Sequence, residues 1–373
     1  MTRPVRIGFI GCGSVMQDGY LPIARDLHAR GLAELRVACD TDPGHAARIQ
    51  HLGLPAFTTD YRAVLADDAV DLVLVLTPPA FHAPLAAAAL HSGKHVLLEK
   101  PMALSLVDAA ALVSLASHSP GILLTAPHII LSPTYQQIGW HLHQGAIGTV
   151  FTARGICGHS GPDWGAWYYQ SDGGGPLFDL AVYNVTSLTG WLGPVRRVTA
   201  FVGTAIPTRR VGSRQVQVTT EDNTQLLLDF GNAVFASVTS SFTIQQYRDA
   251  TLELYGTQGT IRLQGDDWAP NGFDRWQATS SVWEHVEDPA PEWCYLDGLR
   301  HMVACIRTGA RPMSTPEHAY HVLEVLLKAR DASRTGQAQT IESTFPPLTF
   351  RSISMWLGLL VLWAVTVHWD EDL

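Results

Sequence analysis

The chain has 373 residues, of which 46% are hydrophobic and 16% are charged. At roughly 150 residues per domain, this length predicts two domains with a sizeable core and excludes a disordered chain or a single small module. The formal net charge of −9 comes without any basic run, so we expect no nucleic acid partner.

Residues 1–126 alternate short apolar runs with helical patterns. Strands are predicted at Val5 to Ile10, Leu35 to Cys39, Leu72 to Leu76, His95 to Leu98 and Ile122 to Thr125. Helices are predicted at Tyr20 to Arg30, Pro43 to His51, Ala80 to His91 and Leu106 to Ala116. Because such alternation produces parallel strands with right-handed crossovers, we expect a doubly wound Rossmann domain and an α/β fold class.

The pattern changes near Gly148, and residues 127–345 are expected to form an α+β domain. Alternating apolar and polar residues predict strands at Val195 to Val202, Val216 to Thr219, Gln225 to Phe230, Ala233 to Ser240, Thr251 to Tyr255 and Thr260 to Leu263. Helices that would cover this sheet are predicted at Pro176 to Leu192, about Cys294 to Thr308, and Pro316 to Arg334. We therefore expect a largely antiparallel open sheet packed closely against the first domain.

A last strand is expected near Thr340 to Ile341, before an apolar tail at residues 346–373. The almost wholly apolar run Met355 to Val367 is shorter than the roughly 20 residues that span a bilayer, so we do not expect a membrane partner. Three alternatives stay open for the tail: packing on a neighbouring surface, a non-native or poorly ordered end, and a membrane-interface segment.

The five cysteines are widely scattered and contain no Cys-x-x-Cys pair, which argues against a disulfide framework. They are Cys12, Cys39, Cys157, Cys294 and Cys305. The first apolar run is too short to be the apolar region of a signal peptide. We therefore expect a cytoplasmic protein.

A glycine turn joins the first predicted strand to the first predicted helix. A dinucleotide pyrophosphate needs exposed backbone N–H groups at such a helix start, so the turn is expected to hold the cofactor. Its residues are Gly11, Cys12, Gly13, Ser14 and Val15. Met16 stands where the usual motif has a third glycine, so a flavodoxin-like turn of other purpose stays an alternative.

Asp40 ends the second predicted strand, where its carboxylate can accept hydrogen bonds from an adenosine ribose. The same charge would repel a 2′-phosphate, so we expect NAD, with NADP possible. Asp40 could instead cap the strand end by pairing with Thr41 or Asp42.

Glu99, Lys100 and Pro101 follow a buried strand, so they are expected at the carboxyl edge of the parallel sheet, where ligands bind. A lysine there can donate to a substrate hydroxyl and stabilise developing alkoxide charge. The alternative is a surface pair of Glu99 and Lys100.

A glycine loop at residues 172–175 leads into the predicted helix from Pro176, and Asp179 and Tyr183 lie four residues apart on one face of it. A neighbouring Lys⁺ would favour the ionised form of Tyr183 and ease proton exchange near neutral pH. The alternative is a buried tyrosine with a satisfied hydroxyl.

These segments in this order resemble the glucose-fructose oxidoreductase, inositol dehydrogenase and MocA (Gfo/Idh/MocA) family of NAD(P)-dependent oxidoreductases, from about Val5 to Ser343. The resemblance implies that Lys100 is the catalytic lysine, Asp179 the substrate-binding acid and Tyr183 the general acid/base. Most members have His at the last position, which puts the pH dependence of the reaction in question. Thr315 to Glu317 also resembles the family's C-terminal pattern.

Further site residues are expected around the same edge. Thr77, Pro78 and His82 resemble the family's loop near the nicotinamide, although His82 could instead cap the next helix. His128 is a candidate substrate contact or a packed core histidine. Trp164, within an aromatic stretch that includes Trp167 and Tyr168, suits the C–H face of a sugar or could fill the core or a subunit contact.

Neither His141 with His143 nor His318 with His321 is accompanied by cysteines or acidic residues at a known metal-ligand spacing, so no metal site is expected. The sequence as a whole predicts hydride transfer between a nicotinamide and a secondary alcohol or ketone of a sugar, inositol or related polyol. A glycosidase that uses NAD for transient oxidation and a non-catalytic dinucleotide sensor are the alternatives. A homodimer or homotetramer through the C-terminal sheet is also expected.

Overall fold

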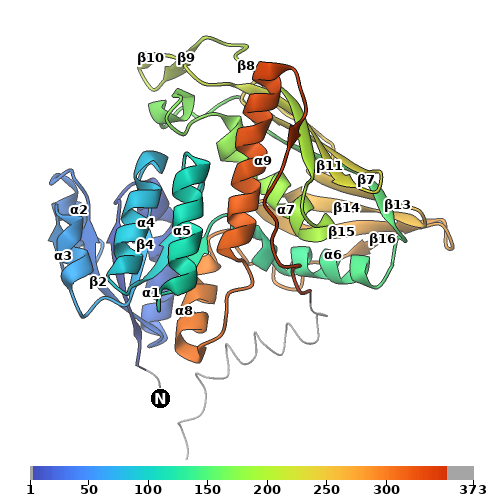
Figure 1. Ribbon diagram of the computed structural model, residues 1–373. Coiled ribbons are helices and arrows are strands. Elements are labelled where there is room, and N and C mark those ends of the chain that lie inside the picture. Colours follow the sequence, from blue (N-terminus) through green and yellow to red (C-terminus); the bar gives the residue numbers. More distant parts are fainter. Residues whose placement is uncertain (1–2, 351–373) are drawn as a thin grey trace, which may run out of the picture.

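The computed structural model describes residues 3–350, and it shows two lobes packed side by side (Figure 1). The predictions for the apolar run Met355 to Val367 lie outside the described residues. Among the described residues, no helix is long and apolar enough to cross a membrane.

The N-terminal lobe is built on a six-stranded parallel sheet in the order β3-β2-β1-β4-β5-β6, so the doubly wound prediction is confirmed. Its strands are β1 Val5–Ile10, β2 Ala33–Cys39, β3 Phe57–Thr58, β4 Leu72–Val75, β5 His95–Leu98 and β6 Leu123–Thr125. Its helices are α1 Leu21–Ala29, α2 His45–His51, α3 Tyr61–Ala66, α4 His82–His91 and α5 Leu106–His118. All four residues of β4 are buried, as expected for a central strand covered on both faces.

Two short elements and one irregular helix start were not predicted in this lobe. β3 and α3 were missed because two and six residues give no measurable periodicity. A π-helical segment, Val15–Tyr20, lies between the glycine turn and the first helix.

The C-terminal lobe contains a nine-stranded sheet in the order β16-β15-β14-β13-β7-β12-β11-β8-β17. Every pair in it is antiparallel except β7 with β12, which confirms the largely antiparallel prediction. The strands are β7 Val150–Gly158, β8 Arg197–Gly203, β11 Asn223–Gly231, β12 Val234–Ser241, β13 Leu252–Gly256, β14 Gly259–Asp266, β15 Ala269–Gln277, β16 Val282–Val286 and β17 Gln339–Thr340. A separate hairpin consists of β9 Thr208–Val211 and β10 Arg214–Gln217.

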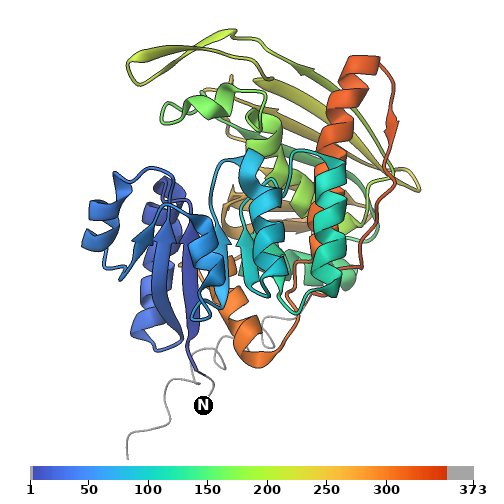
Figure 2. The same ribbon diagram turned by 60° about the vertical axis from the view of Figure 1, so that its left-hand side comes forward.

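Three helices cover one face of this sheet: α6 Pro133–His143, α7 Val182–Leu192 and α9 Pro316–Thr335. Figure 2 shows α9 in red, running up beside the sheet on the side that faces the N-terminal lobe. α6 was not predicted, and Ser132 caps its start by accepting a hydrogen bond from the Tyr135 N–H.

The prediction that the helix near Cys294 to Thr308 covers the C-terminal sheet is wrong. This helix, α8 Gly298–Thr308, packs against α1, β1 and β5 of the N-terminal lobe. Its buried Leu299 and Met302 belong to the same core as Ile7 and Leu97. An amphipathic pattern identifies the apolar face of a helix but not the sheet against which that face packs. The sequence therefore could not show that α8 packs against the N-terminal lobe.

Candidate active site

The glycine turn leaves the carboxyl end of β1 in the conformation that a dinucleotide-binding turn requires. Gly11 has φ +98°, and a Cβ on it would lie 2.7 Å from the carbonyl oxygen of Leu76. Nothing lies within 4 Å of a Cβ built on Gly13, and Gly13, Ser14 and Val15 are exposed. The open backbone at this helix start fits a pyrophosphate.

Asp40 is fixed by two backbone N–H groups beside this turn. Its Oδ2 accepts from the Cys12 N–H at 2.8 Å and its Oδ1 from the Asp42 N–H at 3.0 Å. The predicted pairing with Asp42 therefore exists. It also holds the carboxylate next to the turn, where it could face an adenosine ribose.

Lys100 follows β5 at the same edge of the sheet and points toward the C-terminal lobe. Its Nζ donates to Asp179 Oδ1 at 2.7 Å and to the Asp179 carbonyl oxygen at 3.1 Å. Burial alone would lower the pKa of Lys100, but the negative charge of Asp179, with smaller contributions from Tyr183 and Glu99, raises it well above its ordinary value. Lys100 therefore forms an ion pair between the lobes, with both side chains 14% exposed, and not the alternative surface pair with Glu99.

Tyr183 lies beside this ion pair, on the first turn of α7. The Lys100 Nζ is 5.3 Å from the centre of the Tyr183 ring, and the tyrosine is 7% exposed. Lys100 lowers the pKa of Tyr183, as predicted, but burial raises it more, so the net pKa lies well above the ordinary value. The expectation that proton exchange at Tyr183 is eased near neutral pH is therefore wrong.

The glycine loop before Asp179 is tightly packed. Gly173 has φ +118°, and a Cβ on it would lie 2.7 Å from the Cβ of Pro79 in the N-terminal lobe. Behind the loop, Arg330 of α9 donates to Glu221 Oε1 at 2.8 Å, and that oxygen would lie 2.5 Å from a Cβ on Gly175. Glycine is required here because both the backbone conformation and the space exclude side chains.

Comparison with known proteins identifies the family of this chain. Residues 5–126 match the model of the oxidoreductase family with an NAD-binding Rossmann fold, and residues 135–262 match the GFO/IDH/MocA C-terminal domain. A dTDP-3,4-didehydro-2,6-dideoxy-alpha-D-glucose 3-reductase of Saccharopolyspora spinosa is 30% identical over 76% of this chain and 80% of its own. The chain belongs to the Gfo/Idh/MocA family. Its N-terminal lobe is an NAD-binding Rossmann domain, and it is an NAD(P)-dependent oxidoreductase.

Other Gfo/Idh/MocA proteins match over most of the chain. D-apiose dehydrogenase of Paraburkholderia graminis is 28% identical and covers 92% of this chain and 92% of its own. The scyllo-inositol 2-dehydrogenase (NAD(+)) of Bacillus subtilis is 25% identical over 90% of this chain and 96% of its own. A levoglucosan dehydrogenase solved with NADH and levoglucosan has the same fold, with a TM-score of 0.82, 20% identity, and coverage of 91% of this chain and 100% of that one.

The two histidines predicted near the site, His82 and His128, are both buried. His82 contacts the carbonyl oxygens of Pro101 at 2.6 Å and Thr77 at 2.7 Å, so it ties together the two loops that contain Thr77 to Pro79 and Glu99 to Pro101. His128 is fully buried against Gly298. Burial lowers the pKa of His128 to about 3.

Three tyrosine and tryptophan side chains near the site were not predicted. The Tyr20 hydroxyl donates to Glu99 Oε1 at 2.7 Å. Trp268, from the turn between β14 and β15, packs edge-on against the Tyr183 ring with centroids 6.0 Å apart. Tyr295 precedes α8 and is close enough for its charge to influence the pKa of Tyr183. No motif marks these positions, because chain segments far apart in sequence bring them together.

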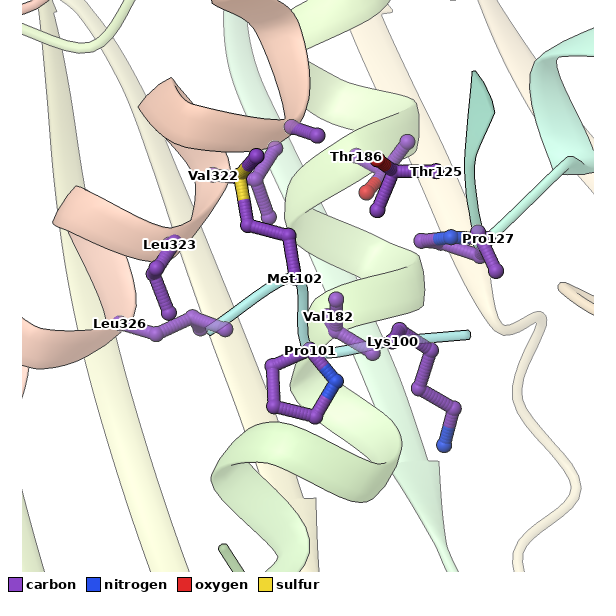
Figure 3. Close-up of a pocket in the computed structure, with 12 residues that line it drawn as sticks. Lys100, Pro101, Met102, Thr125, Pro127, Val182, Thr186, Val322, Leu323 and Leu326 are labelled. Carbon is purple, nitrogen blue, oxygen red and sulfur yellow. The ribbon is translucent and has the colours of Figure 1, made fainter. Parts of the chain in front are cut away.

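A cavity of about 20 Å³ lies behind Lys100, between its loop and helices α7 and α9 (Figure 3). The hydroxyls of Thr125 and Thr186 line it, and neither has a hydrogen-bond partner among the described residues. The space suffices for one water molecule, which needs at least about 10–15 Å³. Figure 3 shows the Lys100 ammonium group pointing away from both threonines, so a substrate would meet it on the other side.

Proposed function

We propose that the chain catalyses reversible hydride transfer between a nicotinamide and a secondary alcohol carbon of a cyclic polyol, sugar or sugar derivative. One observation carries the proposal: Lys100, Asp179 and Tyr183 converge from two lobes at the carboxyl edge of the Rossmann sheet. The relatives named for apiose, levoglucosan and scyllo-inositol support the substrate class.

Each of the three side chains has a distinct role in the reaction. The Lys100 ammonium donates to the reacting oxygen and stabilises alkoxide character as the C–H bond breaks. Tyr183 exchanges the hydroxyl proton. Asp179 orients Lys100 and accepts a hydrogen bond from a neighbouring substrate hydroxyl.

The turn Gly11 to Val15 and Asp40 would hold the pyrophosphate and the adenosine ribose of NAD. When bound, the nicotinamide supplies the acceptor or donor of the hydride. Thr77 and Pro78 would border the nicotinamide half, because their loop meets the glycine loop through Pro79 and Gly173.

The test is a screen of sugars and inositols with NAD and NADP, followed by Lys100→Met. We expect Lys100→Met to abolish turnover while NADH binding, measured by fluorescence, is retained. Lys328→Met on α9 is the matched control and should keep full turnover. Retained turnover in Lys100→Met would refute the assignment. Release of free sugar from an aryl glycoside, without net change in nicotinamide absorbance, would point to the glycosidase instead.

We also propose that the chain forms a homodimer or homotetramer through the open face of the nine-stranded sheet. That face exposes Phe201 at 85%, Leu227 at 59% and Phe235 at 52% on three neighbouring strands. Exposed apolar patches on a sheet face indicate a protein contact. Light scattering should show an oligomer for the wild type and a smaller species for Phe201→Asp with Leu227→Asp, whereas an unchanged mass would contradict this interface.

A reducing cytoplasm is the compartment that we propose. All five cysteines are free, and four of them are buried. Burial raises the pKa of Cys12 to about 12 and that of Cys39 to about 11, so neither forms a reactive thiolate. Fractionation of cells that express the chain tests the location.

A further inference from the structure

A cluster of aromatic side chains lies beside the candidate active site, and no other described residue covers its exposed surface. It consists of Trp164, Trp167, Tyr168 and His159, which we call the aromatic wall. Trp167 stacks on Tyr168 with centroids 3.8 Å apart, and Trp164 meets Tyr168 edge-on at 5.9 Å. His159 lies 6.4 Å from Trp164. Trp164 is 66% exposed and Trp167 38% exposed, so the wall presents indole surface to solvent.

The aromatic wall is built directly onto the loop that positions Asp179. The Gly175 N–H donates to the Tyr168 carbonyl oxygen at 2.7 Å, and the Asp179 N–H donates to the Gly175 carbonyl oxygen at 3.0 Å. Two backbone hydrogen bonds therefore connect the wall to the carboxylate that binds Lys100. Figures 1 and 2 show the segment between β7 and α7 above the carboxyl ends of the parallel strands.

The electrostatic coupling of the wall to the site agrees with this geometry. Burial is the main cause that raises the pKa of Tyr168, and the charge of Asp179 is the next. Burial lowers the pKa of His159, and Asp179 opposes that shift. Both side chains therefore lie within electrostatic range of the carboxylate at the reacting centre.

An aromatic surface that is exposed and rigidly connected to a site suits a flat, partly apolar ligand. One sugar ring held by Lys100, Asp179 and Tyr183 would occupy the reacting centre and leave Trp164 uncovered. Resting on the proposed function, we propose that the aromatic wall is a subsite for a second sugar ring, so that the preferred substrate is a disaccharide or similar glycoside oxidised on one of its rings.

The charges around the wall favour a neutral ring over a nucleotide diphosphate. Asp163 and Asp172 flank the wall and are both exposed, and their carboxylates would repel a pyrophosphate. Two arginines contact the segment between β7 and α7, and both already have partners. Arg209 is bound to Asp222 and to the Ser160 and Phe242 carbonyls, and Arg330 is bound to Glu221 and to the Gly174 carbonyl. Both guanidinium groups therefore have little capacity left for a phosphate.

The test compares matched substrates that differ only in the second ring. The pairs are methyl β-D-glucoside with cellobiose, methyl α-D-glucoside with maltose, and methyl β-D-galactoside with lactose. We expect kcat/KM with NAD to be at least about tenfold higher for one disaccharide than for its methyl glycoside. Trp164→Ala should lower kcat/KM for the disaccharide far more than for the methyl glycoside and so remove that advantage, and Trp164→Phe should have an intermediate effect. Calorimetric titration of the same disaccharide into the NADH complex should show the same loss of affinity.

Trp283 of β16 provides the matched control, since it is also exposed, at 53%, and lies on an edge strand. Trp283→Ala should leave kcat/KM unchanged for both the disaccharide and the methyl glycoside. Turnover of methyl glycosides without a disaccharide advantage, or an equal loss for both substrates in Trp164→Ala, would overturn the subsite and leave the proposed function standing. Tighter binding of dTDP-glucose than of any disaccharide would overturn it in favour of a nucleotide. If no member of any pair is oxidised or bound, both proposals fail for these sugars.

Discussion

Lys100 and Asp179 form an ion pair that joins the two lobes, with Nζ 2.7 Å from Oδ1. The lysine follows a parallel strand of the N-terminal sheet, and the aspartate lies in the π-helical segment Leu177–Ala181 before α7. Both side chains are largely buried, so each would be left with an unpaired group if the other were removed. The same ion pair therefore belongs both to the candidate site and to the contact between the lobes.

The first prediction concerns the charge in this pair. Asp179→Asn keeps the shape of the side chain but removes the charge that raises the pKa of Lys100 most strongly. The pKa of Lys100 should fall, and kcat/KM should drop about 100-fold, the order expected when a catalytic group loses its positioning contact. The pH–rate profile and NADH titration of the variant check this. An unchanged profile with full turnover would contradict the role of Asp179.

The second prediction concerns Tyr183. Because burial raises its pKa, the phenol stays protonated near neutral pH, so little phenolate is present to accept a proton. Oxidation, which needs the phenolate, should therefore accelerate as the pH rises, whereas reduction should not. Tyr183→His introduces a group with an ordinary pKa near 6.5, so oxidation should level off at lower pH. Tyr183→Phe is the control for loss of the proton carrier, and three identical pH profiles would argue for another group.

Much of the fold could be predicted because hydrophobic periodicity reports buried faces. The strands Val5–Ile10 and His95–Leu98 have the predicted bounds, and the alternation of strands and helices predicted the parallel pairing of the first sheet. The sheet against which α8 packs could not be predicted, since its apolar face fits either sheet. Short β3 and α3 lie below the length at which a period can be recognised.

The site was predictable where one short motif contains the chemistry, and not where distant segments meet. Lys100 and Asp179 came from local motifs, and the structure brings them into contact. Tyr20 and Trp268 contact Glu99 and Tyr183 only through the fold. The net pKa shift of Tyr183 also depends on burial, which a sequence does not show for a single side chain.

The third prediction concerns coenzyme choice. Asp40→Asn keeps a side-chain oxygen that can accept from the Cys12 N–H but removes the negative charge beside the ribose site. A unit charge about 4 Å from a phosphate costs about 1–4 kcal/mol, so the preference for NAD over NADP should fall at least about tenfold. Steady-state kinetics with both coenzymes measure the ratio. An unchanged ratio would show that Asp40 does not face the 2′ position.

The fourth prediction separates backbone strain from packing in the glycine loop. Gly173→Ala adds a Cβ against Pro79 and forces alanine to φ +118°, which should lower the free energy of unfolding by about 1–3 kcal/mol and also reduce turnover. Gly193→Ala is the matched control, since Gly193 has φ +88° with nothing within 4 Å of a Cβ. Gly193→Ala should lower the free energy of unfolding without reducing turnover. Equal activity in the two variants would show that the contact with Pro79 does not position the site.

The fifth prediction concerns acid stability and four histidines, of which His301 is partly buried and the other three are buried. Burial lowers the pKa of His128 and His318 to about 3 and that of His301 and His321 to about 4. Between these values and the unfolded pKa near 6.5, the unfolded chain binds more protons than the folded one, so stability falls as the pH falls through this window.

Each histidine can contribute at most about 1.4 kcal/mol per pH unit to that slope. Chemical denaturation at several pH values between about 7 and 5 should therefore show a steep loss of unfolding free energy. His318→Gln, which replaces the partner of Thr189 Oγ1 at 2.8 Å, should reduce the slope, and substitution of the exposed His118 by Gln is the matched control. A slope that is the same in wild type and His318→Gln would mean that His318 is not held neutral by burial, because only a histidine that gains a proton on unfolding steepens the dependence.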